Sequence, residues 1–315
     1  MGEYLGKSSE FVSQQPGVLQ VWLFRAAAAL ETDRTDDGIA AGRQLVALGA
    51  DNATDPETAR VMAMLERRDW LSSLPAAAQA VKERKAFAIA DLAMTLVPIE
   101  PGSFLMGSAK GLANEKPVTK VILSETFWMS KTEVTQKQWS ALVDHNPSRF
   151  KGDALPVESV TWIEATAFCR QLTEREQAAG RLPQDYKFCL PTEAQWDYAC
   201  RTGARSSGSG ALDAVAWYAK NSAGSTQGVA QKQPDSWGLY DMLGNVWEWC
   251  QDWYGPYPGG SVTDPQGPED GESRVCRGGA WGNSARICRP SYRGWDRPAT
   301  SFDVLGFRVA LVRVK

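Results

Sequence analysis

The spacing of hydrophobic and polar residues divides the chain in two near residue 94. From residue 18 to about residue 92, apolar positions recur at helical intervals in an Ala-rich sequence. Thr54 and Glu57 have the spacing of a capping box, and Pro56 stands early in the helix that they start, where its missing N–H costs little. The pattern predicts a helical N-terminal segment over residues 1–93, which docks onto a partner or links to an upstream domain. Its abrupt start predicts that the chain is the end of a larger protein.

After residue 94, short apolar pieces alternate with turns rich in Gly and Pro. Strands are predicted over residues 95–99, 118–123 and 127–129, and helices over 132–144 and 162–176. Long irregular stretches between residues 203 and 271 need internal pinning by side chains or ions in a compact domain. We therefore expect residues 94–315 to form an α+β domain that contains much irregular coil.

The last forty residues combine patterned flanks with an unpatterned interior. The flanks are Arg274–Trp281 and Leu305–Val309, which together we call the terminal frame. Between Gly282 and Val304, small, aromatic, charged and aliphatic residues follow neither a helical nor a strand period. This pattern predicts loops that a fixed frame presents to a partner.

The amino-acid composition indicates which classes of partner and which cellular compartment to expect. The formal net charge of -3, from 34 basic and 37 acidic residues, gives no general attraction for nucleic acid or for an anionic membrane surface. No apolar run approaches the ~18 residues of a membrane span, and the first twenty residues lack the pattern of a signal peptide. The six cysteines form no C-x-x-C pair, so we expect free buried thiols and a cytoplasmic, reducing location.

Seven motifs in collinear order carry a resemblance to a known family. They are Gly102–Ser108, Glu115–Pro117, Lys131–Thr135, Pro156–Val160, Leu190–Trp196, Gly238–Trp249 and the terminal frame. Together they resemble the formylglycine-generating enzyme (sulfatase-modifying factor) family over residues 94–315. The resemblance implies a C-type-lectin-like fold.

The resemblance implies three chemistries, and the residues discriminate among them. The sulfatase-activating members carry two cysteines, five positions apart, as soft thiolate ligands for copper(I). The matching positions here are Asn283 and Cys288, so a single vestigial thiol remains. The branch that resembles ergothioneine-type synthases holds iron with three histidines, whereas this chain has only His145. We therefore expect neither copper nor iron.

The third branch consists of binding modules, including the variable proteins of diversity-generating retroelements. In those proteins adenine-directed mutagenesis varies Asn-type codons, and the resemblance implies a variable region over residues 274–309 here. All the predicted ligand-binding residues except Trp295 are permitted products of such codons: Gly282, Asn283, Ser284, Arg286, Ile287, Tyr292, Gly294, Trp295, Asp296, Ser301, Phe302, Asp303 and Val304. The ligand is unknown, and a protein, a glycan or a phage surface fits. A fixed-sequence scaffold protein and a divergent formylglycine-generating-type oxidoreductase stay open as alternatives.

Within the terminal loops, rigid aromatic side chains are the expected binding anchors. These are Tyr292, Trp295 and Phe302, with Arg286, Asp296 and Asp303 as polar partners. Trp281, Arg293 and Phe307 are expected to belong to the terminal frame.

A tight turn after residue 240 is a candidate structural calcium site. The ligands that the resemblance implies are the carboxylates of Asp241 and Glu248 and the main-chain oxygens of Gly244 and Val246. Hard oxygen donors of this kind suit calcium. The alternative is a structural turn in which backbone N–H groups satisfy both carboxylates.

Overall fold

The computed structural model describes residues 80–81, 83–203 and 211–314. These residues divide into two units, which are described separately. The larger unit contains Arg84–Leu172 and Phe188–Val312, and the smaller contains Thr173–Lys187 with the neighbouring terminal residues. The predicted helices before residue 80 lie outside the described residues. Within the described part, no helix combines the length and the apolar character needed to cross a membrane.

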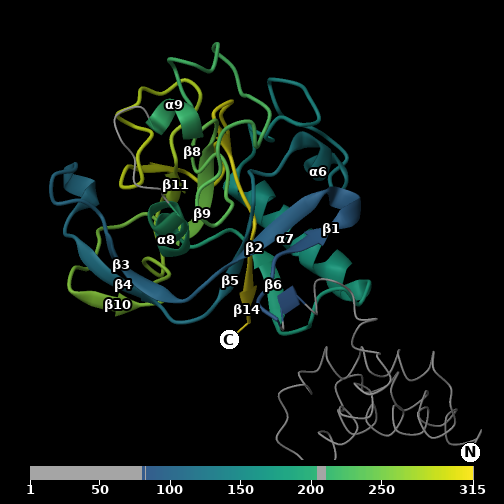
Figure 1. Cartoon of the computed structure of the whole chain (residues 1–315), viewed down its shortest axis with the longest axis horizontal. Coiled ribbons are helices and arrows are strands. Elements are labelled where there is room, and N and C mark those ends of the chain that lie inside the picture. Colours follow the sequence, from purple (N-terminus) through teal and green to yellow (C-terminus); the bar gives the residue numbers. More distant parts are fainter. Residues whose placement is uncertain (1–79, 82, 204–210, 315) are drawn as a thin grey trace, which may run out of the picture. The chain divides into compact units, whose positions relative to one another are not determined.

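A five-stranded sheet forms one side of the larger unit (Figure 1). Its strands, in the order β1-β2-β5-β14-β6, are β1 (Phe87–Ile89), β2 (Met94–Ile99), β5 (Phe127–Ser130), β14 (Ala310–Arg313) and β6 (Tyr186–Cys189). Strands β2 and β5 confirm two of the predicted strands. Strand β1 pairs with β2, so the sheet begins within a segment that the sequence predicted to be helical and before residue 94.

A three-stranded sheet, β10-β4-β3, packs against helix α8 of the same unit. Its strands are β3 (Gly102–Met106), β4 (Thr119–Leu123) and β10 (Ser261–Thr263), and α8 is Glu193–Gly203. A Cβ atom on Gly102 would lie 2.3 Å from the hydroxyl oxygen of Tyr198, so glycine permits this close packing. Trp196 and Ala199 of α8 are fully buried, in the same core cluster as Met106 of β3 and Val121 of β4. The sequence did not predict this helix.

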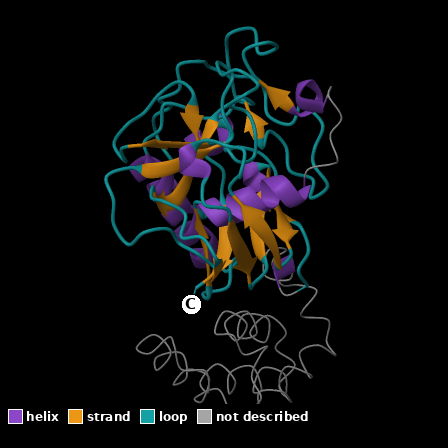
Figure 2. Ribbon diagram, turned by 90° about the vertical axis from the view of Figure 1, so that its left-hand side faces the viewer, coloured by secondary structure: helices purple, strands orange, loops and turns teal. Residues whose placement is uncertain are grey.

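A four-stranded sheet, β12-β11-β9-β13, carries the end of the chain. It consists of β9 (Trp247–Trp253), β11 (Arg274–Arg277), β12 (Arg293–Asp296) and β13 (Leu305–Gly306). A small parallel pair, β7 (Ala216–Trp217) and β8 (Leu243–Gly244), and the short helix α9 (Ala211–Val215) lie before it in the sequence. Much of the chain between the strands is irregular loop, as predicted (Figure 2).

The two predicted helices are present, but one is much shorter than predicted. Helix α7 spans Trp162–Ala178, close to its predicted range. Helix α6 spans only Gln136–Ser140, because Thr135 and Gln138 form a capping box that starts the helix there. The two residues before the cap are held by other partners: Glu133 by the main chain of Val246, and Val134 by the carbonyl of Phe307.

The described part of the smaller unit contains the end of α7, the start of β6 and, after the helix, a turn closed by an ion pair. The guanidinium of Arg181 donates to both carboxylate oxygens of Glu176, at 2.6 and 2.7 Å. Gly180 between them has a φ of +65°, which glycine adopts without strain. The amide of Val314 donates to the carbonyl of Asp185.

Candidate functional site

Strands β11, β12 and β13 fix the ends of the terminal loops. Strand β11 pairs antiparallel with β12 and with β9, and β13 pairs in parallel with β9. The loops over residues 278–292 and 297–304 therefore begin and end on one sheet. Strands β11 and β13 lie within the two flanks of the predicted terminal frame. Strand β12, by contrast, lies inside the stretch of residues 282–304 that was predicted to form loops, so that prediction was wrong for Arg293–Asp296.

Buried arginines of the terminal frame hold these loops from inside. Arg277 is fully buried and donates to the carbonyls of Tyr292, at 2.9 Å, and Pro290, at 2.6 Å. Arg293 binds both carboxylate oxygens of Glu193, at 2.6 and 2.7 Å. The Arg277 bonds thus order the loop backbone at Pro290 and Tyr292 through buried main-chain contacts. Of the three residues expected to belong to the terminal frame, Arg293 and Phe307 are buried and Trp281 is half-buried.

None of the thirteen predicted ligand-binding residues is buried. Six are exposed: Gly282, Ser284, Arg286, Trp295, Ser301 and Phe302. Seven are half-buried: Asn283, Ile287, Tyr292, Gly294, Asp296, Asp303 and Val304. Trp295 and Phe302 are large apolar side chains that are 50% and 51% exposed, which is typical of an interaction surface.

A groove of about 270 Å³ runs across this surface, and we call it the terminal groove. Six predicted residues line it: Tyr292, Gly294, Trp295, Asp296, Phe302 and Val304. Its other walls come from Trp247, Cys276, Arg293 and Leu305. The structure therefore brings together about half of the predicted set, including all three aromatic residues.

Other members of the set have structural roles that the sequence did not reveal. The side-chain oxygen of Asn283 accepts the Ala280 amide at 3.0 Å, so this side chain closes a turn. A Cβ atom on Gly294 would lie 2.7 Å from the sulfur of Cys276 and 3.0 Å from the Trp247 ring, so a larger residue does not fit there. Gly282, by contrast, has no neighbour that a Cβ atom would meet.

The orientation of Trp295 also differs from the simple prediction of three equivalent anchors. Its ring stacks on Tyr254 with centroids 4.5 Å apart, and the Arg293 guanidinium lies over the same Tyr254 ring. Residues 293 and 295 therefore share one face of β12, while Gly294 faces Trp247 on the other. Trp295 borders the terminal groove, but its stacking partner lies on the opposite face of the strand.

The two positions that hold copper-binding thiolates in the sulfatase-activating enzymes are Asn283 and Cys288 in this chain. Cys288 is buried, and burial raises the pKa of its thiol to about 11. Asn283 supplies no thiol and its side-chain oxygen is engaged in the turn. Cys276 is buried in β11, as expected for a core residue, and burial raises its pKa as well. These residues do not fit a two-thiolate copper site.

The predicted calcium ligands lie in a buried cluster of charges. Glu248 accepts two bonds from Arg308, at 2.6 and 2.7 Å, and Asp241 accepts the Ala230 amide at 2.8 Å. Oδ1 of Asp241 is buried without a hydrogen-bond partner. A third buried carboxylate, Glu133, accepts the amide of Val246 at 3.0 Å.

The cluster places three carboxylates against a single guanidinium. Burial, followed by the charges of Asp241 and Glu248, raises the pKa of Glu133 well above its ordinary value. Burial likewise raises the pKa of Asp241 to about 6. Among the described residues, no three His, Cys, Asp or Glu side chains are arranged to hold a metal ion. A cation here would therefore need main-chain oxygens, as predicted for Gly244 and Val246.

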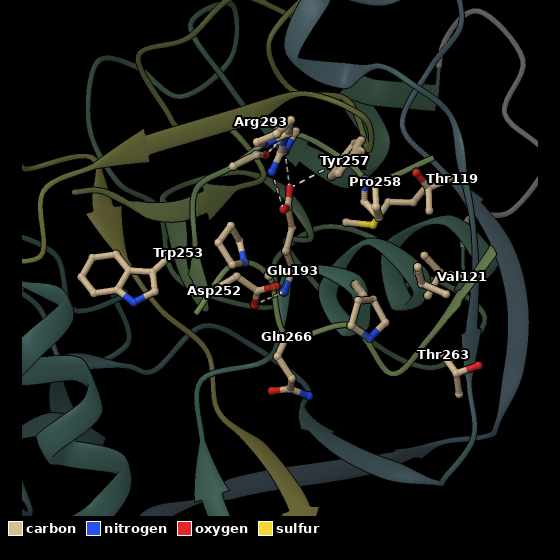
Figure 3. Close-up of a pocket in the computed structure, with 18 residues that line it drawn as sticks. Thr119, Val121, Glu193, Asp252, Trp253, Tyr257, Pro258, Thr263, Gln266 and Arg293 are labelled. Carbon is tan, nitrogen blue, oxygen red and sulfur yellow. Dashed lines mark hydrogen bonds and ion pairs between the residues drawn. The ribbon is translucent and has the colours of Figure 1, made fainter. Parts of the chain in front are cut away.

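A second cavity, of about 450 Å³, was not predicted from the sequence. It lies at the start of α8, between strands β3 and β4 and the loop that follows β9, and we call it the α8 pocket (Figure 3). Glu193 extends from the start of the helix toward Arg293 and Tyr257. The only sequence signal was the Pro191-Thr192-Glu193 motif, which is typical of a helix start.

Asp252 is the most perturbed carboxyl group of the α8 pocket. Its side chain accepts the backbone amide of Glu193 at 2.8 Å. Burial, followed by the neighbouring charge of Glu193, raises the pKa of Asp252 to about 7. Glu193 has the opposite behaviour, because Arg293 and Arg277 lower its pKa despite the opposing effect of burial. Of these two adjacent carboxylates, Asp252 therefore titrates near neutral pH and Glu193 does not.

Comparisons with known proteins agree with this fold. A family model described as "Sulfatase-modifying factor enzyme 1-like domain" matches residues 82–313. Chaperone protein LppX of Paenibacillus barcinonensis is 32% identical over 246 residues, which are 63% of this chain and 82% of that protein. The formylglycine-generating enzyme of Streptomyces coelicolor is 34% identical over 182 residues, 49% of this chain and 52% of that enzyme. The match therefore spans about half of that enzyme.

A solved structure also resembles this chain. "Treponema denticola variable protein 1" superposes with a TM-score of 0.65 at 31% identity. The match covers 72% of this chain and 98% of that protein. The expected C-type-lectin-like fold is thereby confirmed for the matched region.

Proposed function

Because the chain belongs to the sulfatase-modifying factor enzyme 1-like family, we propose that it is a ligand-binding member without catalytic activity, the variable protein of a diversity-generating retroelement. The observation that carries the proposal is the terminal groove, which six predicted variable positions line. The likeness to the Treponema variable protein supports it. The family also contains enzymes such as the formylglycine-generating enzymes, so a divergent enzyme and a fixed-sequence scaffold are the alternatives.

The gene's surroundings test the diversification directly. We expect a reverse transcriptase gene and a near-copy of the stretch that encodes residues 282–304, differing from it only at adenines. Gly294 should be an invariant or restricted position, because a Cβ atom there would meet Cys276 and Trp247. Differences spread over all four bases, or no near-copy, would instead support the fixed-sequence scaffold.

An activity assay tests the enzyme alternative. We expect no aldehyde formation on a Cys-containing sulfatase-type peptide, even with copper(I) supplied, because one thiolate position is Asn283 and the Cys288 thiol is buried. Mass spectrometry of the peptide would detect the product. Turnover that Cys288→Ser abolishes while the protein stays folded would contradict the proposal, and Cys200→Ser, another buried thiol, is the matched control.

We propose calcium as a structural ion at the buried cluster. The unpartnered Oδ1 of Asp241 and the excess of buried negative charge support this assignment. Millimolar calcium should raise the melting temperature relative to EDTA, since a ligand at ~100 times its Kd adds about 2.7 kcal/mol of stability. Asp241→Asn should remove this dependence. Calorimetry that gives equal melting temperatures in calcium and EDTA would rule the ion out.

Location and partners follow from the same proposal. None of the six cysteines, all within the described residues, forms a disulfide bond, which supports a reducing, cytoplasmic compartment. The partner is a protein or glycan surface rather than a nucleic acid, in keeping with the net charge of -3. The N-terminal segment would connect the binding domain to an upstream domain or to a second partner.

A further inference from the structure

The residues of the terminal groove also indicate the chemistry of its ligand, an inference that rests on the binding function proposed above. A diversified surface has no ligand common to all its variants, but each variant has its own. The groove residues of this particular sequence variant therefore determine which ligand it binds.

One face of β12 contributes a carboxylate to the groove. Gly294 faces the Trp247 ring, and Asp296 shares that face because side chains alternate along a strand. Gly294 is the register partner of Cys276, a residue of the groove wall, and Asp296 lines the same groove. Asp296 is half-buried and accepts only the amide of Arg297. It forms no salt bridge with any residue in the described part of the chain.

Two basic residues beside the groove are paired with carboxylates, whereas Arg274, the cross-strand partner of Asp296, lies over the rings of Trp162 and Trp253 and forms no ion pair with Asp296. Arg293 lines the groove, but its guanidinium is bound by Glu193 at 2.6 and 2.7 Å. Arg289 lies over the Tyr292 ring, 5.2 Å from its centroid, and is paired with Glu115. Among the residues that line the groove, Asp296 thus supplies the charge without a counter-ion. The groove lining therefore contains one carboxylate that no described residue binds in an ion pair.

Aromatic rings accompany this carboxylate. Trp247 and Tyr292 pack together with centroids 5.9 Å apart, and Phe302 lines the same groove with half of its surface exposed. The carbonyl of Phe302 accepts the amides of Ser159 and Leu305, which orders the residue before any ligand binds. Rings with a nearby carboxylate attract a cation through the negative face of the π-system and through direct charge.

We propose that the terminal groove binds a cationic side chain, lysine or arginine, of a protein partner. The charged head would lie against the rings of Trp247, Tyr292 and Phe302, with Asp296 as its counter-ion. A basic side chain is small enough for a groove of about 270 Å³ and brings the charge that the groove lacks. A neutral glycan would leave Asp296 without a counter-ion.

Matched small probes test the charge directly. The probes are the N-acetyl amides of lysine and arginine, and their neutral counterparts are the N-acetyl amides of norleucine and citrulline. Titration is followed by the indole N–H signal of Trp247, assigned with a Trp247→Phe variant. We expect the cations to bind about fivefold or more tightly than their neutral counterparts, in line with a cation–π contact at a partly exposed site.

A matched pair of variants separates the local carboxylate from overall charge. Asp296→Asn should weaken lysine and arginine binding about fivefold and leave norleucine binding unchanged. Asp270→Asn, at an exposed loop position outside the groove, should change neither. Equal losses in the two variants would overturn the inference. The dispersion of the indole signals confirms that each variant is folded.

The outcomes distinguish this inference from the binding function on which it rests. Neutral probes that bind as tightly as the cations would show a binding groove without selectivity for charge, so the inference would fail while the binding function stands. A groove that binds none of the probes would overturn the inference, and the adenine-specific near-copy then decides the proposed function independently. Binding of free choline with no binding of either amino-acid amide would replace the protein partner by a small quaternary amine.

Discussion

Arg308→Met is expected to lower the free energy of unfolding by about 3–5 kcal/mol, because it leaves buried carboxylates without their guanidinium. Arg308 is fully buried and binds both oxygens of Glu248, and it also donates to the carbonyls of Ser130 and Tyr240. The substitution keeps a long side chain and removes the charge and these hydrogen bonds. Urea unfolding, followed by tryptophan fluorescence in EDTA, measures the loss.

Two further variants identify the origin of this loss. Arg149→Met breaks the exposed ion pair with Asp303, so it should cost less than about 1 kcal/mol. Adding Glu248→Gln to Arg308→Met removes one unpaired charge and should restore part of the stability. An Arg308→Met protein with the stability of the Arg149→Met control would show that the buried cluster does not need its guanidinium. A double variant no more stable than Arg308→Met would assign the loss to packing.

The sequence predicted those parts of the fold that depend on local pattern. The range of α7 and the strands β2 and β5 follow from apolar periodicity, and the terminal frame follows from its patterned flanks. Helix α6 begins later than periodicity suggests because Glu133 and Val134 bond to residues more than a hundred positions away. Such tertiary partners have no local signal, so the true start of α6 could not be found from the sequence.

The candidate site was predicted as a set of positions, and the structure assigns their roles. Asn283 and Gly294 both suit a variable codon, yet one closes a turn and the other makes room for Trp247. The face that Trp295 occupies depends on the pairing of β12 with β11, which a short strand inside a loop does not reveal. The residue types in the sequence were enough to predict which stretch forms the surface. Which of its residues are available to a ligand and which have structural roles depends on strand register and packing, which the structure provides.

The α8 pocket could not be predicted from the sequence, because its carboxylates come together only in the folded chain. Glu193 and Asp252 are distant in sequence and unremarkable as single residues. They become a coupled pair because the start of α8 lies against the end of β9, where the Glu193 amide donates to Asp252. Their different pKa shifts then follow from which of the two carboxylates Arg293 binds.

Asp252→Asn is expected to stabilise the protein at about pH 8 and to have little effect near pH 4. Burial raises the pKa of Asp252 from its ordinary 3.8 to about 7 in the folded state. The folded state therefore binds the proton more strongly than the unfolded state. This stabilisation is complete below the unfolded pKa and is lost as the pH rises through the folded one, an effect of about 4 kcal/mol at most.

Asparagine keeps an oxygen that can accept the Glu193 amide, but it has no proton to lose in this range. The stability difference between Asp252→Asn and the unsubstituted protein should therefore grow from pH 4 to about pH 8, by on the order of 2–4 kcal/mol. Taking this difference cancels the pH dependence of other buried carboxyls such as Asp241, whose pKa is also raised. Urea unfolding at several pH values measures it, with Asp270→Asn as the exposed control. A difference that does not vary with pH would mean that Asp252 titrates in its ordinary range, and that burial beside Glu193 does not keep its proton bound.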